Sequence, residues 1–244
     1  MPGTGHFFYP GIFRAGPLPG VRILGRQDGK KACFGDAIRG CIVPPQPLSA
    51  RRYDKNITMP PAAVKTIRDQ IYWQYAKLIS KSAGLPNARA FQMSRFTKLR
   101  EGEIVWSSTI REWLHEHENP DACIYCGVQG GPLTTEHILP RCCGGPDIPD
   151  NAIRVCRSCN SEKGGKRLYE WKGLAEKDAI PRIAEGKYLK LLYDLHEQRG
   201  TLNVDKKDLG RFMCPACDLH QRCEAEGTVE KMTVYCLEGG FHAE

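Results

Sequence analysis

The chain has 244 residues, of which 41% are hydrophobic and 26% are charged. This composition is ordinary for a globular protein, and it excludes a largely disordered chain, a collagen-like fibre and a coiled coil. No apolar run approaches the roughly 18 to 20 residues that cross a bilayer, and residues 1–20 lack the basic and apolar regions of a secretory signal. We therefore expect a soluble, cytoplasmic protein.

Charge and cysteine content indicate the kind of partner and cofactor. The 35 Lys and Arg residues exceed the 28 Asp and Glu residues, and the resulting net charge of +7 favours a polyanionic partner. The chain also has 12 cysteines. Because thiols stay reduced inside cells, cysteines at short paired spacings predict zinc ligands rather than disulfides.

Glycine and proline are frequent in the first part of the chain, residues 1–57. Their dipeptides favour turns over long helices, so we assign these residues to a separate N-terminal region. Cys33 and Cys41 lie here without closely spaced partners, which is typical of small buried side chains.

The next region is expected to be mainly helical. Apolar residues recur at helical spacing over residues 58–84, with Pro60 and Pro61 placed to form the first turn. A second helix is predicted over Thr109–Glu118. We therefore treat residues 58–119 as a helical region that either packs on the core or contacts nucleic acid.

Two paired cysteine motifs mark the region 120–173. Cys123 and Cys126 form one CxxC motif, and Cys156 and Cys159 form another. Two such motifs supply four thiolates, which complete a tetrahedral zinc site. Because that site leaves no coordination position open, the predicted zinc has a structural role.

The sequence between and after these motifs predicts the order strand, loop, strand, helix. Polar and apolar residues alternate over 134–140, a loop with a Gly-Gly-Pro turn spans 141–150, and a second strand over 151–155 leads into the second CxxC motif. Residues from Asn160 to Trp171 then have a helical pattern. The four cysteines would hold these elements together.

These residues resemble the His-Asn-His (HNH) endonuclease family, in the zinc-stapled form where CxxC motifs flank a ββα-metal fold. The resemblance rests on Glu136, His137, Asn151 and Asn160, with Lys163 following the second CxxC motif. It covers about 50 residues of the chain. Glu136 stands where Asp is frequent in the family, and Asn160 stands where His is.

The resemblance implies hydrolysis of a phosphodiester bond. His137 would be the general base that activates water, and Asn151 would orient His137 by a hydrogen bond between the strands. Glu136 and Asn160 would supply oxygen ligands to a catalytic Mg²⁺ or Mn²⁺, which would stabilise the leaving oxygen. In an ideal strand Glu136 and His137 point to opposite faces, so a local twist would have to bring both to the phosphate.

Basic side chains are expected to hold the nucleic acid. Arg141, Lys163 and Lys166 would contact backbone phosphates, which positions a substrate without reading its sequence. In this family the flanking segments choose the target, so we also expect the basic and aromatic stretch Arg51–Lys81 to contact DNA.

The remaining chain is predicted to contain a helical segment and a second cysteine cluster. A helix over 187–199 lies within the segment 174–211. Residues 212–244 follow, with a strand-like run at 232–236 that suits a small zinc ribbon. The candidate ligands of this second zinc are Cys214, Cys217, Cys223 and Cys236, for one of which His220 or His242 could substitute. The adjacent Cys142 and Cys143 are given no role.

The sequence therefore predicts an α+β protein with a zinc-stapled ββα-metal nuclease core, mainly helical flanks and a candidate C-terminal zinc ribbon. The predicted function is metal-dependent hydrolysis of DNA by an HNH endonuclease, in a restriction, phage or mobile-element role. The alternative is a non-catalytic zinc-ribbon protein that binds nucleic acid. The complete set Glu136, His137, Asn151 and Asn160 favours the nuclease, because a binding protein does not need all four. No thioredoxin-like pattern surrounds either CxxC motif, which argues against a redox protein.

Overall fold

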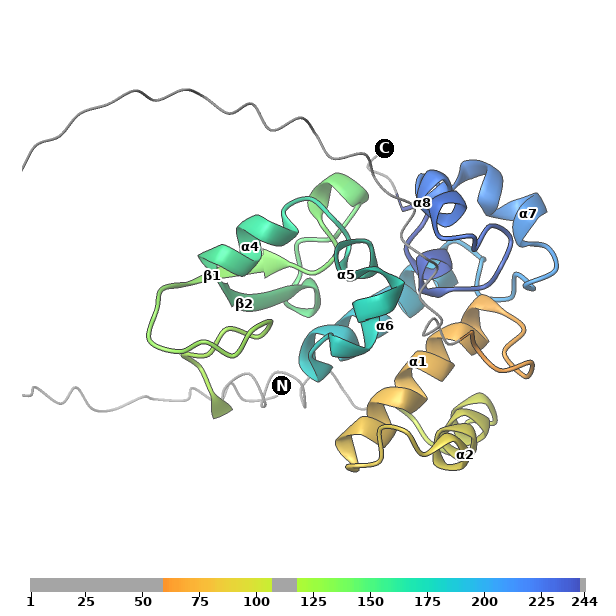
Figure 1. The fold of residues 1–244 in the computed structure, drawn as a ribbon, viewed down its shortest axis with the longest axis horizontal. Coiled ribbons are helices and arrows are strands. Elements are labelled where there is room, and N and C mark those ends of the chain that lie inside the picture. The colour runs from red at the N-terminus through yellow and green to blue at the C-terminus, as the bar shows by residue number, and fades with distance from the viewer. Residues whose placement is uncertain (1–58, 107–117, 242–244) are drawn as a thin grey trace, which may run out of the picture. The chain divides into compact units, whose positions relative to one another are not determined.

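The computed structural model of the protein describes residues 59–106 and 118–241 (Figure 1). These residues belong to one compact unit, residues 50–244. The N-terminal region with Cys33 and Cys41 lies outside the described residues, as does most of the predicted helix Thr109–Glu118. None of the described helices is long and apolar enough to span a membrane.

The described part of the chain is a mixed α+β structure in which a small hairpin is flanked by helices (Figure 1). The two strands, β1 and β2, form an antiparallel sheet. Short 3₁₀ turns connect several elements. The strands are β1 (Leu133–His137) and β2 (Ala152–Cys156), and the α-helices are α1 (Ile67–Ser82), α2 (Arg89–Arg100), α4 (Arg157–Lys163), α5 (Leu168–Glu176), α6 (Arg182–Gln198), α7 (Leu209–Phe212) and α8 (His220–Ala225).

Helix α1 begins later than the sequence predicted. Thr66 caps it, because the Thr66 hydroxyl accepts a hydrogen bond from the Asp69 backbone at 3.1 Å and the Asp69 carboxylate accepts one from the Thr66 backbone at 3.3 Å. The expectation that Pro60 and Pro61 form the first turn is wrong, since both precede this capping box. The buried face of α1 packs on α2 and α6.

Helix α2 was not predicted. Only three of its twelve residues are buried, among them Phe96 and Leu99, so its sequence carries a weak apolar stripe. Phe96 contacts Trp73 of α1 edge-on, with 6.1 Å between ring centroids, and the Arg89 guanidinium lies 4.6 Å from the centroid of the same indole ring. Tertiary contacts with α1 therefore hold this helix in place.

The hairpin and α4 follow the predicted order of strand, loop, strand, helix. Leu133 pairs with Cys156 at one end of the hairpin and His137 pairs with Ala152 at the other. Helix α4 contacts both strands. The predicted continuous helix from Asn160 to Trp171 is instead two helices, α4 and α5, separated by residues 164–167.

The C-terminal segment differs from the predicted zinc ribbon. Within residues 209–241 the structure has the helices α7 and α8 and two 3₁₀ turns, with no strand. The predicted strand at 232–236 is wrong, because Val234–Leu237 is a 3₁₀ turn capped by the Thr233 hydroxyl, which accepts from the Tyr235 backbone at 3.2 Å. Tyr235 and Leu237 are fully buried on this turn, so the strand-like run reflects the packing of a turn.

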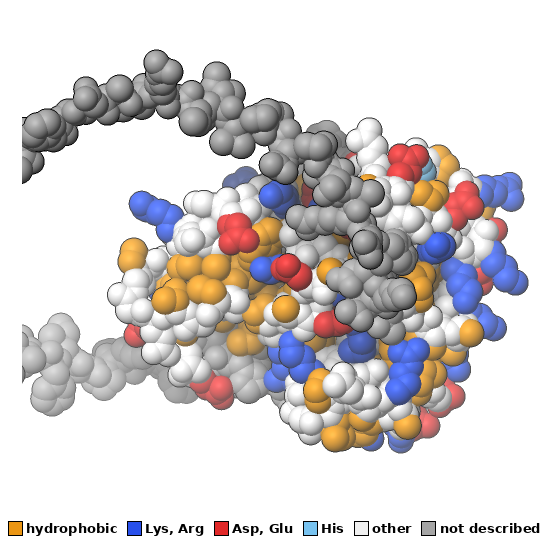
Figure 2. All heavy atoms as spheres, in the orientation of Figure 1, with side chains coloured by type: hydrophobic (Ala, Val, Ile, Leu, Met, Phe, Trp, Pro, Cys, Tyr) orange, Lys and Arg blue, Asp and Glu red, His pale blue; other side chains and the backbone are white. Residues whose placement is uncertain are grey.

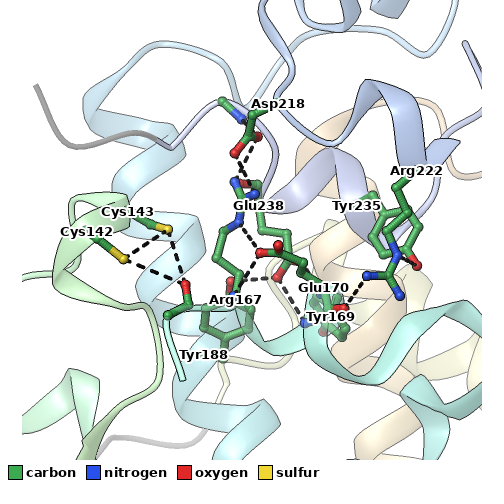
Figure 3. Close-up of polar contacts among 12 residues, drawn as sticks. Cys142, Cys143, Arg167, Tyr169, Glu170, Tyr188, Asp218, Arg222, Tyr235 and Glu238 are labelled. Atoms are coloured by element: carbon green, nitrogen blue, oxygen red, sulfur yellow. Dashed lines mark hydrogen bonds and ion pairs between the residues drawn. The ribbon is translucent and has the colours of Figure 1, made fainter. Parts of the chain in front are cut away.

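A fully buried carboxylate, Glu238, joins this C-terminal segment to two helices. It accepts hydrogen bonds from the Tyr188 hydroxyl of α6 at 2.7 Å and from the Tyr169 backbone at the start of α5 at 3.0 Å, and a further one from the Glu170 backbone (Figure 3). Burial raises the pKa of Glu238 to about 7, although these donors act in the opposite direction.

Arg167, the N-cap residue of α5, completes this buried junction (Figure 3). Its guanidinium donates to both carboxylate oxygens of Asp218, at 3.0 and 2.6 Å, and to the backbone carbonyl of Glu238 at 2.8 Å. It also pairs with Glu170 at 3.1 Å. A bidentate arginine fixes both distance and orientation, so it holds the start of α5 against the C-terminal segment.

Candidate active site

The two CxxC motifs bring four sulfur atoms together beside the hairpin. The ligand atoms of Cys123, Cys126, Cys156 and Cys159 all lie within 4.8 Å of one another, and the Cys126 and Cys156 sulfurs are 3.8 Å apart. A tetrahedral zinc with Zn–S bonds of about 2.3 Å has sulfur–sulfur edges of about 3.8 Å. The donor set and its spacing therefore fit one structural zinc ion.

Local backbone geometry creates this cluster. The first motif is a turn in which the Gly127 backbone donates to the Cys123 carbonyl at 2.8 Å, and Gly127 has a φ of +73°, which favours glycine. In the second motif Cys156 is the N-cap of α4, and its sulfur accepts from the Cys159 backbone at 3.5 Å. Burial opposes the charged form of the Cys123 thiol, but hydrogen bonds from nearby backbone amides lower its pKa to about 7.

His137 ends strand β1 and is paired with an acidic residue of the following loop. Its Nε2 lies 3.1 Å from Oδ1 of Asp147, and its side chain is 26% exposed. The imidazole is thus held by a carboxylate while part of the ring remains open to solvent. Sequence reasoning missed Asp147, because an aspartate after a Gly-Gly-Pro turn is commonly a turn residue.

Asn151 is fully buried and holds the loop between the strands. Its side-chain oxygen accepts from the Leu139 backbone at 2.8 Å, and its amide nitrogen donates to the carbonyls of Leu139 and Pro146, both at 2.9 Å. The expected hydrogen bond from the Asn151 side chain to His137 is not the contact that forms. Asn151 instead shapes the loop that carries Asp147.

Glu136 points away from His137 and forms a buried ion pair. Its Oε1 lies 2.5 Å from the Lys163 ammonium, which also donates to the His137 carbonyl at 3.0 Å. Lys163 is 0% exposed and Glu136 is 6% exposed. The expectation that Lys163 contacts phosphates is therefore wrong for this structure, because its charge is used to neutralise Glu136.

Asn160 lies one turn before Lys163 on α4 and faces the same side of β1. Its amide nitrogen donates to the Thr134 hydroxyl at 2.9 Å, and Thr134 is two residues before Glu136. Glu136 and Asn160 are thus both in the interface between β1 and α4, where each offers an oxygen donor of the type that Mg²⁺ prefers. His137 is on the opposite side of the strand.

Comparison with protein families identifies this region. Residues 123–168 match the family described as HNH endonuclease. Residues 123–168 form an HNH endonuclease domain. This confirms the resemblance, including the zinc-stapled form with which the four-cysteine cluster is consistent. Searches of curated proteins and of solved structures found no match to the chain.

Two exposed basic side chains of the HNH domain, Arg141 and Lys166, lie on adjacent segments. Arg141 begins the 3₁₀ turn Arg141–Cys143, and Lys166 lies in the turn between α4 and α5; both are exposed. The sulfurs of Cys142 and Cys143 are 3.7 and 3.9 Å from the Gly165 carbonyl, so the two segments touch (Figure 3). Figure 2 shows apolar side chains gathered over the hairpin.

A second residue that sequence reasoning missed is Tyr125, inside the first CxxC motif. Its ring contacts Trp171 edge-on at 4.8 Å, and its buried hydroxyl has no hydrogen-bond partner among the described residues. Burial, and then the nearby charge of Glu136, raise the pKa of Tyr125 well above its usual value. The HNH domain therefore keeps an unpaired polar group close to Glu136, and no spacing rule in the sequence indicates it.

Proposed function

We propose that the protein is a metal-dependent endonuclease that hydrolyses phosphodiester bonds in DNA. The observation that carries this proposal is the HNH endonuclease domain at 123–168, in which a partly exposed His137 is paired with Asp147 at 3.1 Å. The HNH family implies a nucleic-acid substrate, and the net charge of +7 suits a polyanion. DNA as the substrate is our proposal.

His137 is the general base in this proposal. When Nε2 carries the ring proton and donates it to Asp147, Nδ1 has a lone pair that can take a proton from water. The water then attacks the phosphorus, and the 3′-oxygen leaves. Asp147 acts as a positioning residue because it fixes the tautomer and the orientation of the ring, while Asn151 holds the loop that places Asp147.

Glu136 and Asn160 are the proposed ligands of the catalytic metal ion. Because they lie across β1 from His137, a local twist at the end of this strand is part of the proposal, so that the metal ligands and the base reach one phosphate. Their oxygen donors suit Mg²⁺ or Mn²⁺, which keep several waters and need few protein ligands. When bound, such an ion supplies charge that stabilises the phosphoryl and leaving oxygens. Lys163 holds one oxygen of Glu136 at 2.5 Å and so orients this carboxylate inside the β1–α4 interface.

Arg141 and Lys166 are the proposed phosphate contacts of the HNH domain. Both are exposed, and the segments that carry them touch at the Gly165 carbonyl. Two cations on adjacent loops can contact successive phosphates of one strand, which positions the backbone without reading its sequence. Any part played by Arg51–Lys81 is an additional proposal that rests on the role of flanking segments in the family.

The direct test is cleavage of supercoiled plasmid by purified protein. We expect nicked or linear product with Mg²⁺ or Mn²⁺ and none with EDTA, because the proposed ligands bind a divalent cation and the structural zinc does not supply an open position. A single-stranded RNA is the comparison substrate and tests whether cleavage is limited to DNA. Absence of cleavage with both metals, in protein that still binds plasmid in a gel shift, would favour the non-catalytic nucleic-acid-binding alternative.

A further inference from the structure

The C-terminal segment, outside the HNH domain, contains a small cavity with four cysteines in its wall. The cavity has a volume of about 20 Å³. A site of that size accommodates a single water-sized particle. The wall includes Cys214, Cys217, Cys223 and Cys236, together with His220 and Lys231.

Three separate elements deliver the four thiols to this cavity. Cys214 begins the 3₁₀ turn Cys214–Ala216, and the Cys217 backbone donates to the Cys214 carbonyl at 3.2 Å, which closes a tight CxxC turn. Cys223 is on α8 and Cys236 is in the turn Val234–Leu237. The fold of this C-terminal segment therefore brings three short elements to one cavity.

The chain also keeps space free behind one of these sulfurs. A Cβ atom added at Gly239 would lie 2.4 Å from the Cys217 sulfur, so any larger residue at 239 would push this thiol aside. All four cysteines are free thiols and only partly exposed, and no disulfide involves any cysteine in the described ranges. Four reduced thiols around a space of atomic size are the donor set of a closed thiolate site.

We propose that Cys214, Cys217, Cys223 and Cys236 bind a second zinc ion, on a helical scaffold that replaces the zinc ribbon expected from the sequence. Among the described residues, only the four cysteines of the HNH domain have all their sulfurs within 4.8 Å of one another. Binding at the second site therefore requires the four sulfurs to move closer together around the ion. Rotation about χ1 moves a sulfur without displacing the backbone.

This second zinc would fix the segment that anchors the end of the HNH domain. Asp218 follows Cys217 directly and receives the Arg167 guanidinium at 2.6 Å, while Glu238, two residues after Cys236, binds the start of α5 (Figure 3). The ion would thus fix the positions of Asp218, which binds Arg167, and Glu238, which binds the start of α5. Its role is structural and does not depend on whether the proposed cleavage is correct.

Metal content of the wild-type chain tests the proposal without any variant. Protein purified by gel filtration without added metal should contain about two zinc ions per chain, because closed thiolate sites hold zinc tightly enough to keep it through purification. Alkylation under native conditions, read by mass spectrometry, should leave Cys214, Cys217, Cys223 and Cys236 unmodified until a strong chelator is added. One zinc per chain, or rapid alkylation of these four thiols before chelation, would overturn the proposal.

Comparing two double variants by zinc content tests whether the second ion binds at these four cysteines. Cys214→Ser with Cys217→Ser should lower the zinc content from about two to about one per chain, whereas Cys142→Ser with Cys143→Ser should leave it at two. Two zinc ions retained in the Cys214/Cys217 variant would overturn the proposal. If that variant does not fold, the alkylation of the wild-type chain still tests the proposal, because it measures whether the same four thiols are protected.

Discussion

At the scale of single residues, Lys163 and Asn151 illustrate what a motif does and does not determine. The motif correctly placed both residues in the HNH domain, but it did not indicate their contacts. Lys163 is buried against Glu136, and Asn151 binds the backbone of the 138–151 loop. A lysine in a sequence is usually exposed, so only the surrounding structure reveals that this charge is used internally. The same holds for Asp147, whose partner His137 is ten residues away in the sequence.

Replacing Asp147 tests its role as a positioning residue. Asp147→Asn keeps the shape of the side chain but removes the charge that favours one His137 tautomer, so we expect kcat to fall by about tenfold. The effect is smaller than that of losing the base because Asp147 is largely exposed. DNA affinity and zinc content should not change.

Asp150→Asn is the matched control for Asp147→Asn, because Asp150 is an exposed acid in the same loop. Cleavage is measured under single-turnover conditions across pH for both variants. Equal rates for Asp147→Asn and Asp150→Asn would show that the 3.1 Å contact with His137 has no part in the reaction.

At the scale of elements, the sequence was most informative where short-range chemistry defines structure. The order of hairpin and helix followed from alternation and from the two CxxC motifs, and the α6 helix followed from a strong apolar stripe. The sequence does not reveal α2 because the buried face of this helix is small. Pro60 and Pro61 favour an earlier start for α1 than the one that the Thr66 cap sets. The C-terminal turn resembled a strand because Thr233, Val234 and Tyr235 are residue types frequent in strands, although here they pack without β-pairing.

The loop of the hairpin gives a sharp test at this scale. A Cβ atom at Gly145 would lie 1.9 Å from the Leu139 carbonyl oxygen and 2.9 Å from the Asn151 amide, so the backbone would have to move. We expect Gly145→Ala to destabilise the protein by about 1 to 3 kcal/mol and to reduce cleavage by displacing Asp147. Gly131→Ala is the control, since a Cβ added at Gly131 would meet no atom within 4 Å. Thermal unfolding that is unchanged by Gly145→Ala would contradict the observed loop packing.

At the scale of the whole molecule, buried polar groups connect the helical flanks. The Tyr169 hydroxyl of α5 donates to Glu185 of α6 at 3.0 Å, and both side chains are buried. Glu238 and Arg167 link the C-terminal segment to the same helices. These contacts join residues far apart in the sequence, which is why neither composition nor periodicity predicted them.

Glu185 makes the stability of this assembly depend on pH. Burial raises the pKa of Glu185 from 4.5 to about 7, so the folded state favours the protonated form. Its contribution to stability is therefore complete below about pH 4.5 and is lost as pH rises through 7. Glu185→Gln mimics the protonated acid. The variant's free energy of unfolding should therefore equal that of the wild type at pH 4.5 and exceed it at pH 8 by up to about 3 kcal/mol.

Urea unfolding at a series of pH values measures this difference. Glu197→Gln is the control because Glu197 is exposed on the same helix, and its stability should follow that of the wild type at every pH. Parallel curves for Glu185→Gln and the wild type between pH 4.5 and pH 8 would show that folding does not raise the pKa of Glu185.

The central claim is that this HNH domain cleaves DNA by using His137 as the base. The most direct measurement compares single-turnover plasmid nicking by the wild type and by His137→Ala, with a gel shift and zinc analysis on the same preparations. We predict a rate loss of about 10² to 10⁴, which corresponds to roughly 3 to 5 kcal/mol of barrier, with DNA binding and zinc content unchanged. Cleavage by His137→Ala at close to the wild-type rate would contradict the account.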